Sequence, residues 1–346
     1  MVSPNVVQEV DITKPGPWAG VPVKELVAAY REHENRTASP DTFKGMLPYK
    51  LRPPLSGRPA IIGRVSPSTK KRGRGNFIQC NACRTEKKHG SGFLALWNGW
   101  TLIAGPICGP KRYGGLAEEI AKFNQTEREN LAERMLLEFA PSALAWADVA
   151  RELAPAAQLA DRAHTKLMRG LKPVRPHFSQ AINEGGVLVL QPPESVRANA
   201  PRTLSRRVQG GQFISMEWRG TASKRVERAG EALSAIIGSN TDLAGVKRRV
   251  ARARINGTLI EMEKGARAAV KDLCEAYDFI SDGQEFLTVE NFTTLKEWCE
   301  HRWSPLPRGS HAGTLGTKRR IGFGAGSNEF VEVGGLLKVK LPYPLP

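Results

Sequence analysis

The sequence predicts a mainly helical α+β protein, and three observations support this fold class. Apolar side chains recur at helical spacing over long segments between residues 116 and 301. Asn98-Gly99 separates two short apolar runs, which predicts a β-hairpin because both residues tolerate the positive φ of a tight turn. Proline and glycine are frequent before residue 75 and after residue 304. We therefore expect a small module around the hairpin, a helical bundle, a small β unit and a long helical hairpin.

These elements divide the chain of 346 residues into six segments. Their boundaries lie where the composition or the periodicity changes. In chain order we expect a Pro/Gly-rich N-terminal region with a short helix and a basic end (1–75), a hairpin module (76–123), a helical segment (124–170), a small β-containing unit with a basic loop (171–220), a basic helical hairpin (221–303) and a Gly-rich basic tail with a β-hairpin (304–346).

The N-terminal region and the hairpin contain short elements. Residues 1–20 are rich in proline, glycine and small polar residues, so we expect a loose arm there. Apolar patterns predict a helix over 22–34 and a strand over 60–65. The hairpin places Trp97 opposite Trp100, a pair that contributes about 0.5–1 kcal/mol of stability. Because both faces of the hairpin are apolar, we interpret these tryptophans as core residues rather than as a platform for stacking bases.

Helical patterns dominate the segment after the hairpin. We expect three helices, over 116–139, 141–153 and 155–170, with Pro141 and Pro155 each at the start of a helix. Their connections are short, which is typical of a packed bundle. A strand over 187–190 and a second strand over 212–218 would follow, joined by a long basic loop.

The last third of the sequence returns to helical periodicity. A pattern from 222 to about 280 breaks near 238–240, and two helices joined by a short turn there would form an antiparallel hairpin. A shorter helix is expected over about 290–301. In the tail, two apolar runs at 330–333 and 336–341 predict a second β-hairpin.

Three of the five cysteines indicate a metal site. Cys80 and Cys83 form a C-x2-C pair, whose turn brings two sulfurs to one point, as tetrahedral zinc requires. Cys108 follows the hairpin. An alternative interpretation is that the three residues are small hydrophobes that are neighbours by chance. We expect Cys274 and Cys299 to be buried packing residues, and the sparse, odd number of cysteines argues against a disulfide framework.

The order of cysteine pair, hairpin, cysteine and helix resembles the treble-clef zinc finger over about residues 76–123. The resemblance implies that Cys80 and Cys83 form the knuckle and that Cys108 is the third zinc ligand. The family uses this fold to bind DNA, RNA, proteins and small ligands, so the resemblance leaves the function open.

The fourth ligand departs from the treble-clef pattern. The resemblance implies a ligand three positions after the third cysteine, where this sequence has Lys111, whose ammonium group cannot bind a cation. The candidates that remain are His89, which would complete a Cys3His set, a carboxylate such as Glu86, and a water molecule.

A formal net charge of +17 and a pI near 9.9 indicate a polyanionic partner. Nucleic acid is the commonest polyanion in a cell, and basic side chains bind it by releasing counterions. Each basic cluster by itself also fits an ordinary solvated face. The candidate phosphate contacts are Lys70, Lys71, Arg72 and Arg74 before the cysteine pair, Lys247, Arg248, Arg249, Arg252 and Arg254 in a helical segment, and Lys318, Arg319 and Arg320 in the tail.

The sequence contains no P-loop, zinc-protease or nucleophile-elbow motif. We therefore expect a non-enzymatic, zinc-containing protein that binds DNA or RNA through phosphates. Two alternatives remain open. The protein could be an adaptor or inhibitor that docks on an acidic partner or a nucleic-acid enzyme, or a structural component of an assembly such as a viral particle. No export signal and no run of about 20 apolar residues is present, so we expect a cytoplasmic location without a membrane partner.

Overall fold

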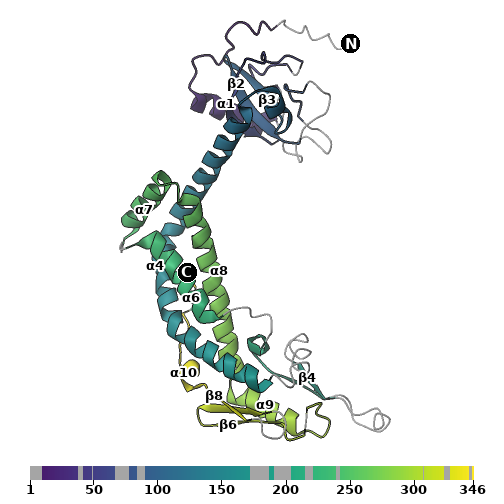
Figure 1. The fold of residues 1–346 in the computed structure, drawn as a ribbon, viewed down its shortest axis with the longest axis vertical. Coiled ribbons are helices and arrows are strands. Elements are labelled where there is room, and N and C mark those ends of the chain that lie inside the picture. Colours follow the sequence, from purple (N-terminus) through teal and green to yellow (C-terminus); the bar gives the residue numbers. More distant parts are fainter. Residues whose placement is uncertain are drawn as a thin grey trace, which may run out of the picture. The chain divides into compact units, whose positions relative to one another are not determined.

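The computed structural model describes residues 10–37, 42–48, 50–66, 78–83, 90–171, 187–190, 204–214, 221–238, 242–306, 308–322, 328–342 and 345–346. Two compact units, Met1–Asn130 and Leu131–Pro346, make up the chain (Figure 1). Long helices and small sheets make it a mainly helical α+β protein, as the sequence predicts. Among the described residues, no helix has both the length and the apolar character that crossing a membrane requires.

A three-stranded antiparallel sheet forms the centre of unit 1, and its hairpin is the one predicted from the sequence. Asn98 (φ 46°) and Gly99 (φ 74°) form the turn with positive φ, and Trp97 pairs with Trp100 beside it. In chain order, the elements of unit 1 are α1 (Val23–Thr37), β1 (Ala60–Val65), β2 (Gly92–Trp97), β3 (Trp100–Ala104), the short α3 (Cys108–Arg112) and the start of α4 at Leu116, with sheet order β1-β2-β3.

The segment before α1 packs on the tip of this hairpin. The backbone N–H of Gly16 donates to the carbonyl of Asn98 (2.8 Å), and the indole N–H of Trp100 donates to the carbonyl of Lys14 (3.0 Å). The arm that the composition of 1–20 predicts to be loose is therefore packed in its described part. The rest of it lies outside the described residues.

Both faces of the sheet are covered, as its apolar pattern predicts. The first face packs against α1, and the second packs against the cysteine turn, α3 and the start of α4. The buried residues are Leu26, Tyr30, Phe43, Val65, Ile78, Leu94 and Ile103 on the first face, and Leu47, Cys80, Ala82, Ala95, Leu102, Ala104, Tyr113 and Leu116 on the second.

The three helices expected after the hairpin are one helix, α4 (Leu116–Leu171), of 56 residues. Pro141 and Pro155 lie inside it rather than at helix starts, so this expectation was wrong. A proline removes one helical hydrogen bond but does not prevent the helix from continuing. The buried stripe stays in phase across both prolines, and its burial stabilises the continuous helix. Members of this stripe are Leu136, Ala140, Ala143, Ala150, Leu153, Ala157 and Ala160.

Three helices, α4, α6 (Ala222–Ile237) and α8 (Leu259–Phe286), lie side by side in unit 2 (Figure 1). Breaks fall at Gly238 (φ 63°) and Gly257 (φ 69°), where the backbone leaves the helical region. Helix α6, the first helix of the expected hairpin, packs mainly along α8 rather than along the helix that follows it in the chain. The orientation of α6 and α8 is antiparallel. The helices of this part are α6 (Ala222–Ile237), α7 (Leu243–Ile255), α8 (Leu259–Phe286) and α9 (Val289–Glu300).

Polar contacts between helices determine how α6 is placed. The carboxylate of Asp161 in α4 accepts hydrogen bonds from the backbone N–H groups of Ala222 (2.8 Å) and Ser223 (2.9 Å), and thereby caps α6. Arg225 in α6 pairs with Asp272 of α8 at 3.1 Å. These contacts connect the start of α6 to both of its neighbours.

The small β unit contains β4 (Val187–Leu190) and β5 (Leu204–Arg207), which pair antiparallel. The first strand was predicted correctly, but the second is not at 212–218. Residues Gly211–Ile214 form a 3-10 helix, η4, which buries Phe213 in the core of unit 2. The remainder of that predicted strand lies outside the described residues.

The tail forms a three-stranded antiparallel sheet of β6 (His311–Leu315), β7 (Lys318–Gly322) and β8 (Glu329–Glu332), in that order. The predicted pairing of 330–333 with 336–341 is wrong, because β8 pairs with β7 instead. The second run contains a short helix, α10 (Gly334–Leu337), whose Leu336 is buried in the core.

Candidate metal centre

The cysteine turn is attached to β3 by one buried polar side chain. The backbone N–H of Asn81 donates to the carbonyl of Ile103 (2.9 Å), and its side-chain oxygen accepts from the N–H of Ile103 (2.9 Å). Its amide group donates to the carbonyls of Leu47 and Pro48, both at 3.0 Å. Cys108 begins α3, shortly after the end of β3. Asn81 therefore holds the C-x2-C turn in register with the strand that leads to the third cysteine.

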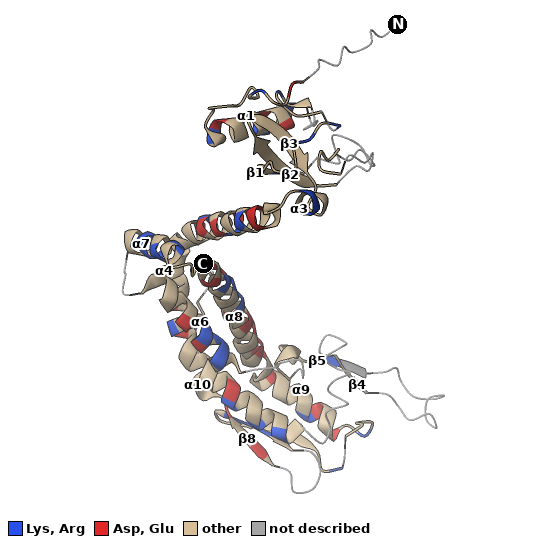
Figure 2. Ribbon diagram, turned by 45° about the horizontal axis from the view of Figure 1, so that its top comes forward, with Lys and Arg blue, Asp and Glu red and all other residues tan. Residues whose placement is uncertain are grey.

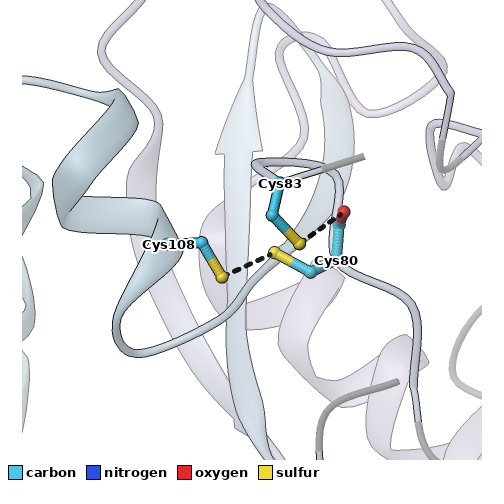
Figure 3. A group of neighbouring side chains, drawn as sticks. All are labelled: Cys80, Cys83 and Cys108. Carbon is cyan, nitrogen blue, oxygen red and sulfur yellow. Dashed lines mark hydrogen bonds between the residues drawn. The ribbon is translucent and has the colours of Figure 1, made fainter. Parts of the chain in front are cut away.

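The sulfurs of Cys80, Cys83 and Cys108 converge, as the sequence predicts (Figure 3). All three Sγ atoms lie within 4.8 Å of one another, and those of Cys80 and Cys108 are 3.7 Å apart. In a tetrahedral site with Zn–S bonds of about 2.3 Å, two sulfurs are about 3.8 Å apart. The three cysteines thus have the spacing of a metal-binding set and can hold a metal ion.

Burial makes this cluster unfavourable for uncompensated charge. Cys80 has no exposed surface, and its Sγ accepts a hydrogen bond from the backbone N–H of Gly105 (3.1 Å). Burial, and then the neighbouring Cys80, raise the pKa of Cys108 to about 12. Thiolates are the metal-binding form of cysteine, and a bound cation would stabilise them against both effects. The geometry and the donor chemistry therefore fit a thiolate-bound metal.

The residues that the sequence analysis considered at the fourth ligand position are Lys111, His89 and Glu86. Lys111 is exposed in α3, consistent with its exclusion as a ligand. His89 and Glu86 lie outside the described residues. Sequence reasoning missed Tyr113, which is fully buried beside Cys80 in the same core cluster. Burial raises the pKa of the Tyr113 hydroxyl. The sequence did not indicate that Tyr113 is buried, because it lies only two residues after the exposed Lys111.

The first basic cluster, Lys70, Lys71, Arg72 and Arg74, lies outside the described residues. The second is on α7 (Figure 2). In that helix Arg249 donates to the carbonyl of Ala235 (2.6 Å), and Arg254 pairs with Glu133. Within the described part of the chain, the remaining cations of this cluster have no carboxylate partner, and all of them are exposed: Lys247, Arg248 and Arg252.

The third cluster is divided by the pleat of β7. Lys318 and Arg320 are exposed, whereas Arg319 is only 3% exposed. The Nε of Arg319 donates to the carbonyl of Leu287 (2.6 Å), and its guanidinium lies 5.9 Å from the ring centre of Phe292. Burial lowers the pKa of Arg319. Arg319 therefore ties β7 to the end of α8, a role that the sequence did not reveal.

Cys274 and Cys299 belong to unit 2 and are not members of the cysteine cluster. Both are half-buried and pack against the core of unit 2. Burial raises the pKa of both thiols, that of Cys299 to about 12. They behave as the packing residues that the sequence predicts.

The comparisons with known proteins add no relative. No protein-family model matches the chain, and neither a curated protein nor a solved structure matches it. The function must therefore be inferred from the cysteine cluster, the exposed cations and the surfaces around them.

Proposed function

We propose that this protein binds nucleic acid through its phosphates and that a structural zinc ion, bound by Cys80, Cys83 and Cys108, stabilises unit 1. The observation that carries the binding proposal is the exposed cationic face of α7. The zinc proposal rests on three sulfurs whose spacing fits a tetrahedral site. In this proposal the protein performs no covalent chemistry.

The zinc site would be treble-clef-like. The turn that carries Cys80 and Cys83, the β2–β3 hairpin and the helix that begins at Cys108 follow in the order of that fold. His89, Glu86 or a water molecule would supply the fourth ligand. Thiolates favour zinc over magnesium or calcium, which prefer oxygen ligands. The metal would then contribute stability to a module with only a small core.

The cationic face of α7 has the properties of a phosphate-binding surface. Arg248 and Arg252 are one helical turn apart, on the side opposite the buried Val246 and Val250. Lys247 precedes Arg248 in the sequence and is also exposed, and none of the three has a carboxylate partner among the described residues. Because an unpaired surface arginine gives up no ion pair on binding, it can contact a phosphate in a bidentate manner at little cost.

A salt titration tests this surface. We replace Lys247, Arg248 and Arg252 together by glutamine and measure binding to a labelled duplex by fluorescence anisotropy at several salt concentrations. The affinity should fall, and the slope of log K against log salt should become shallower by about one unit for each phosphate that the variant no longer neutralises. A slope that is flat in the native protein would contradict the proposal.

The matched control removes the same charge from another helix. Lys264, Arg267 and Lys271 lie on α8, and each is paired with a glutamate within one turn. Their triple glutamine variant has the same net charge as the α7 variant. If both variants weaken binding equally, overall charge is responsible and α7 is not the binding surface.

A second candidate function is an adaptor that docks on an acidic protein partner. An apolar groove of about 310 Å³ between α4 and α8 favours it, with Met135, Phe139 and Val270 in its lining and Arg267 beside them. Leu131 nearby on α4 is 47% exposed. Capture of a protein partner that survives nuclease treatment and is abolished in a Phe139→Glu variant would favour this candidate over nucleic-acid binding.

A further inference from the structure

A pocket of about 540 Å³ in unit 2 is lined by residues of α9 and of the β6-β7-β8 sheet. Pockets for small ligands have volumes of about 300–1,000 Å³, so this one can enclose a ligand of nucleotide size. Both the sheet and the helix contribute side chains to its wall. The lining residues that bear on ligand binding are Gly313, Arg320 and Phe330 from the sheet, and Lys296 and Glu300 from α9.

The strand register places three of these residues in one row. Gly313 of β6 lies opposite Arg320 of β7, which lies opposite Phe330 of β8. Directly opposed residues of an antiparallel sheet share a face. Arg320 and Phe330 are exposed, whereas their neighbours Arg319 and Val331 are buried on the other face. The row is therefore on the solvent side of the sheet.

The row combines an exposed aromatic ring with a cation. Phe330 is 40% exposed, and the guanidinium of Arg320 lies 5.9 Å from its ring centre. Asn328 orients this arginine, because its side-chain oxygen accepts from Arg320 Nε (2.7 Å) and faces His311 Nε2 (2.8 Å). An oriented guanidinium beside an accessible ring can hold a flat, negatively charged ligand.

The charges of the pocket favour an anion. Lys296 projects from α9 and is exposed, and neither it nor Arg320 has a carboxylate partner among the described residues. Glu300 is the single acidic residue in the pocket lining. The two cations therefore exceed the acidic charge of the lining, and one of them comes from the helix and the other from the sheet.

We propose that this pocket binds one nucleotide unit, with its base against Phe330 and its phosphate between Lys296 and Arg320. Every base has a π-face that can stack on an aromatic side chain, and arginine matches the geometry of phosphate. A base inside a duplex cannot enter a pocket unless it leaves the stack. The ligand is thus a free nucleotide or an unpaired stretch of nucleic acid. This inference rests on the proposed nucleic-acid binding and narrows it to accessible bases.

Gly313 offers a substitution that blocks the pocket from within. An added Cβ at Gly313 meets no other atom within 4 Å, and its φ is not positive, so a side chain fits without strain. Because the residue belongs to the same row as Arg320 and Phe330, a leucine there would occupy the space over the row. Gly313→Leu should therefore leave the fold intact and prevent a ligand from entering.

The experiment compares variants of the full chain by fluorescence anisotropy with three labelled probes. The probes are a single strand of about twelve nucleotides, a duplex of the same length and a single adenosine monophosphate. We expect Gly313→Leu and Phe330→Ala to weaken binding of the single strand or of the mononucleotide by about tenfold. Duplex binding should stay unchanged. Gly230→Leu is the control, because an added Cβ at this residue of α6 also meets no atom within 4 Å.

The three probes distinguish the sources of the nucleotide. Weaker single-strand binding in the two pocket variants supports a strand, and weaker mononucleotide binding alone supports a free nucleotide. The α7 variant could retain duplex binding while the pocket variants no longer bind the single strand. This result would contradict the proposal that α7 binds phosphates and would support the proposal for the pocket. Native affinity of Gly313→Leu and Phe330→Ala for both the single strand and the mononucleotide, with unchanged thermal melting, would overturn the inference.

Discussion

Replacing Cys80 by serine should remove the metal and destabilise unit 1. Cys80 is fully buried, its sulfur is 3.7 Å from that of Cys108, and it accepts the N–H of Gly105. A serine oxygen has a shorter reach and does not form the thiolate that zinc prefers. At a free zinc concentration of about 1,000 times the dissociation constant, binding stabilises the folded state by about 4 kcal/mol. The substitution should abolish that contribution, which is large beside the total stability of about 5–15 kcal/mol of a typical protein.

The assay combines metal analysis with hydrogen exchange. The native protein should retain about one zinc ion per chain after dialysis, and Cys80→Ser should retain almost none. Amide protection in β2 and β3 should fall in the variant and in native protein treated with a chelator, whereas protection in α6 and α8 should not change. Cys274→Ser is the control, because Cys274 is half-buried in unit 2 and has no part in the cluster.

Two results would refute this reasoning. Equal zinc content in the native protein and in Cys80→Ser would show that the three sulfurs do not hold the metal. Unchanged protection of β2 and β3 after complete removal of zinc would show that the metal does not stabilise the module. In either case the cysteines would be ordinary small core residues.

Three further predictions concern stability. Burial, followed by the charges of Glu285 and Asp278, raises the pKa of Asp282 to about 6, so its ionised form destabilises the fold at pH 7. The free energy of unfolding should rise as the pH falls from about 6 to about 4. Asp282→Asn should raise it by about 1 kcal/mol at pH 7, a figure reduced because the carboxylate is partly exposed. Urea unfolding of the native protein and the variant at about pH 4, 6 and 7 measures both effects. Asp161→Ala should cost about 1–2 kcal/mol in the same assay, because it leaves the N–H groups of Ala222 and Ser223 without their acceptor, and an unchanged midpoint would contradict that role. Asn81→Ala should lower the zinc content and cost about 2–3 kcal/mol, since it leaves buried carbonyls unpaired; full zinc retention would count against it.

Local patterns predicted the structure correctly where it depends on neighbouring residues. The turn of Asn98 and Gly99 requires positive φ at both positions, which few other residues adopt, so its hairpin could be predicted with its register. The predicted helix break at 238–240 has the same local cause, the positive φ of Gly238. The cysteine cluster could also be predicted. The short spacing of Cys80 and Cys83 keeps two sulfurs close, and the hairpin that precedes Cys108 brings the chain back toward them.

Errors arose where burial elsewhere in the chain decided the outcome. Pro141 and Pro155 looked like helix starts, but the buried stripe of α4 continues through them because α6 and α8 cover it. The sequence predicted that β8 pairs with the segment that follows it. In the structure β8 pairs with β7, which precedes it in the chain. Pairing between distant strands depends on packing that no local pattern records.

The amino-acid sequence by itself determined the fold class, the hairpin and the convergence of three thiols, because each follows from short-range spacing and from the conformations that single residues allow. Tertiary structure alone decided which basic side chains are exposed and can contact a phosphate. The pleat of β7 buries Arg319 and exposes Arg320, although both belong to one basic run. The same register places Arg320 beside Phe330, and packing of the sheet with α9 brings residues from a helix and three strands into one pocket.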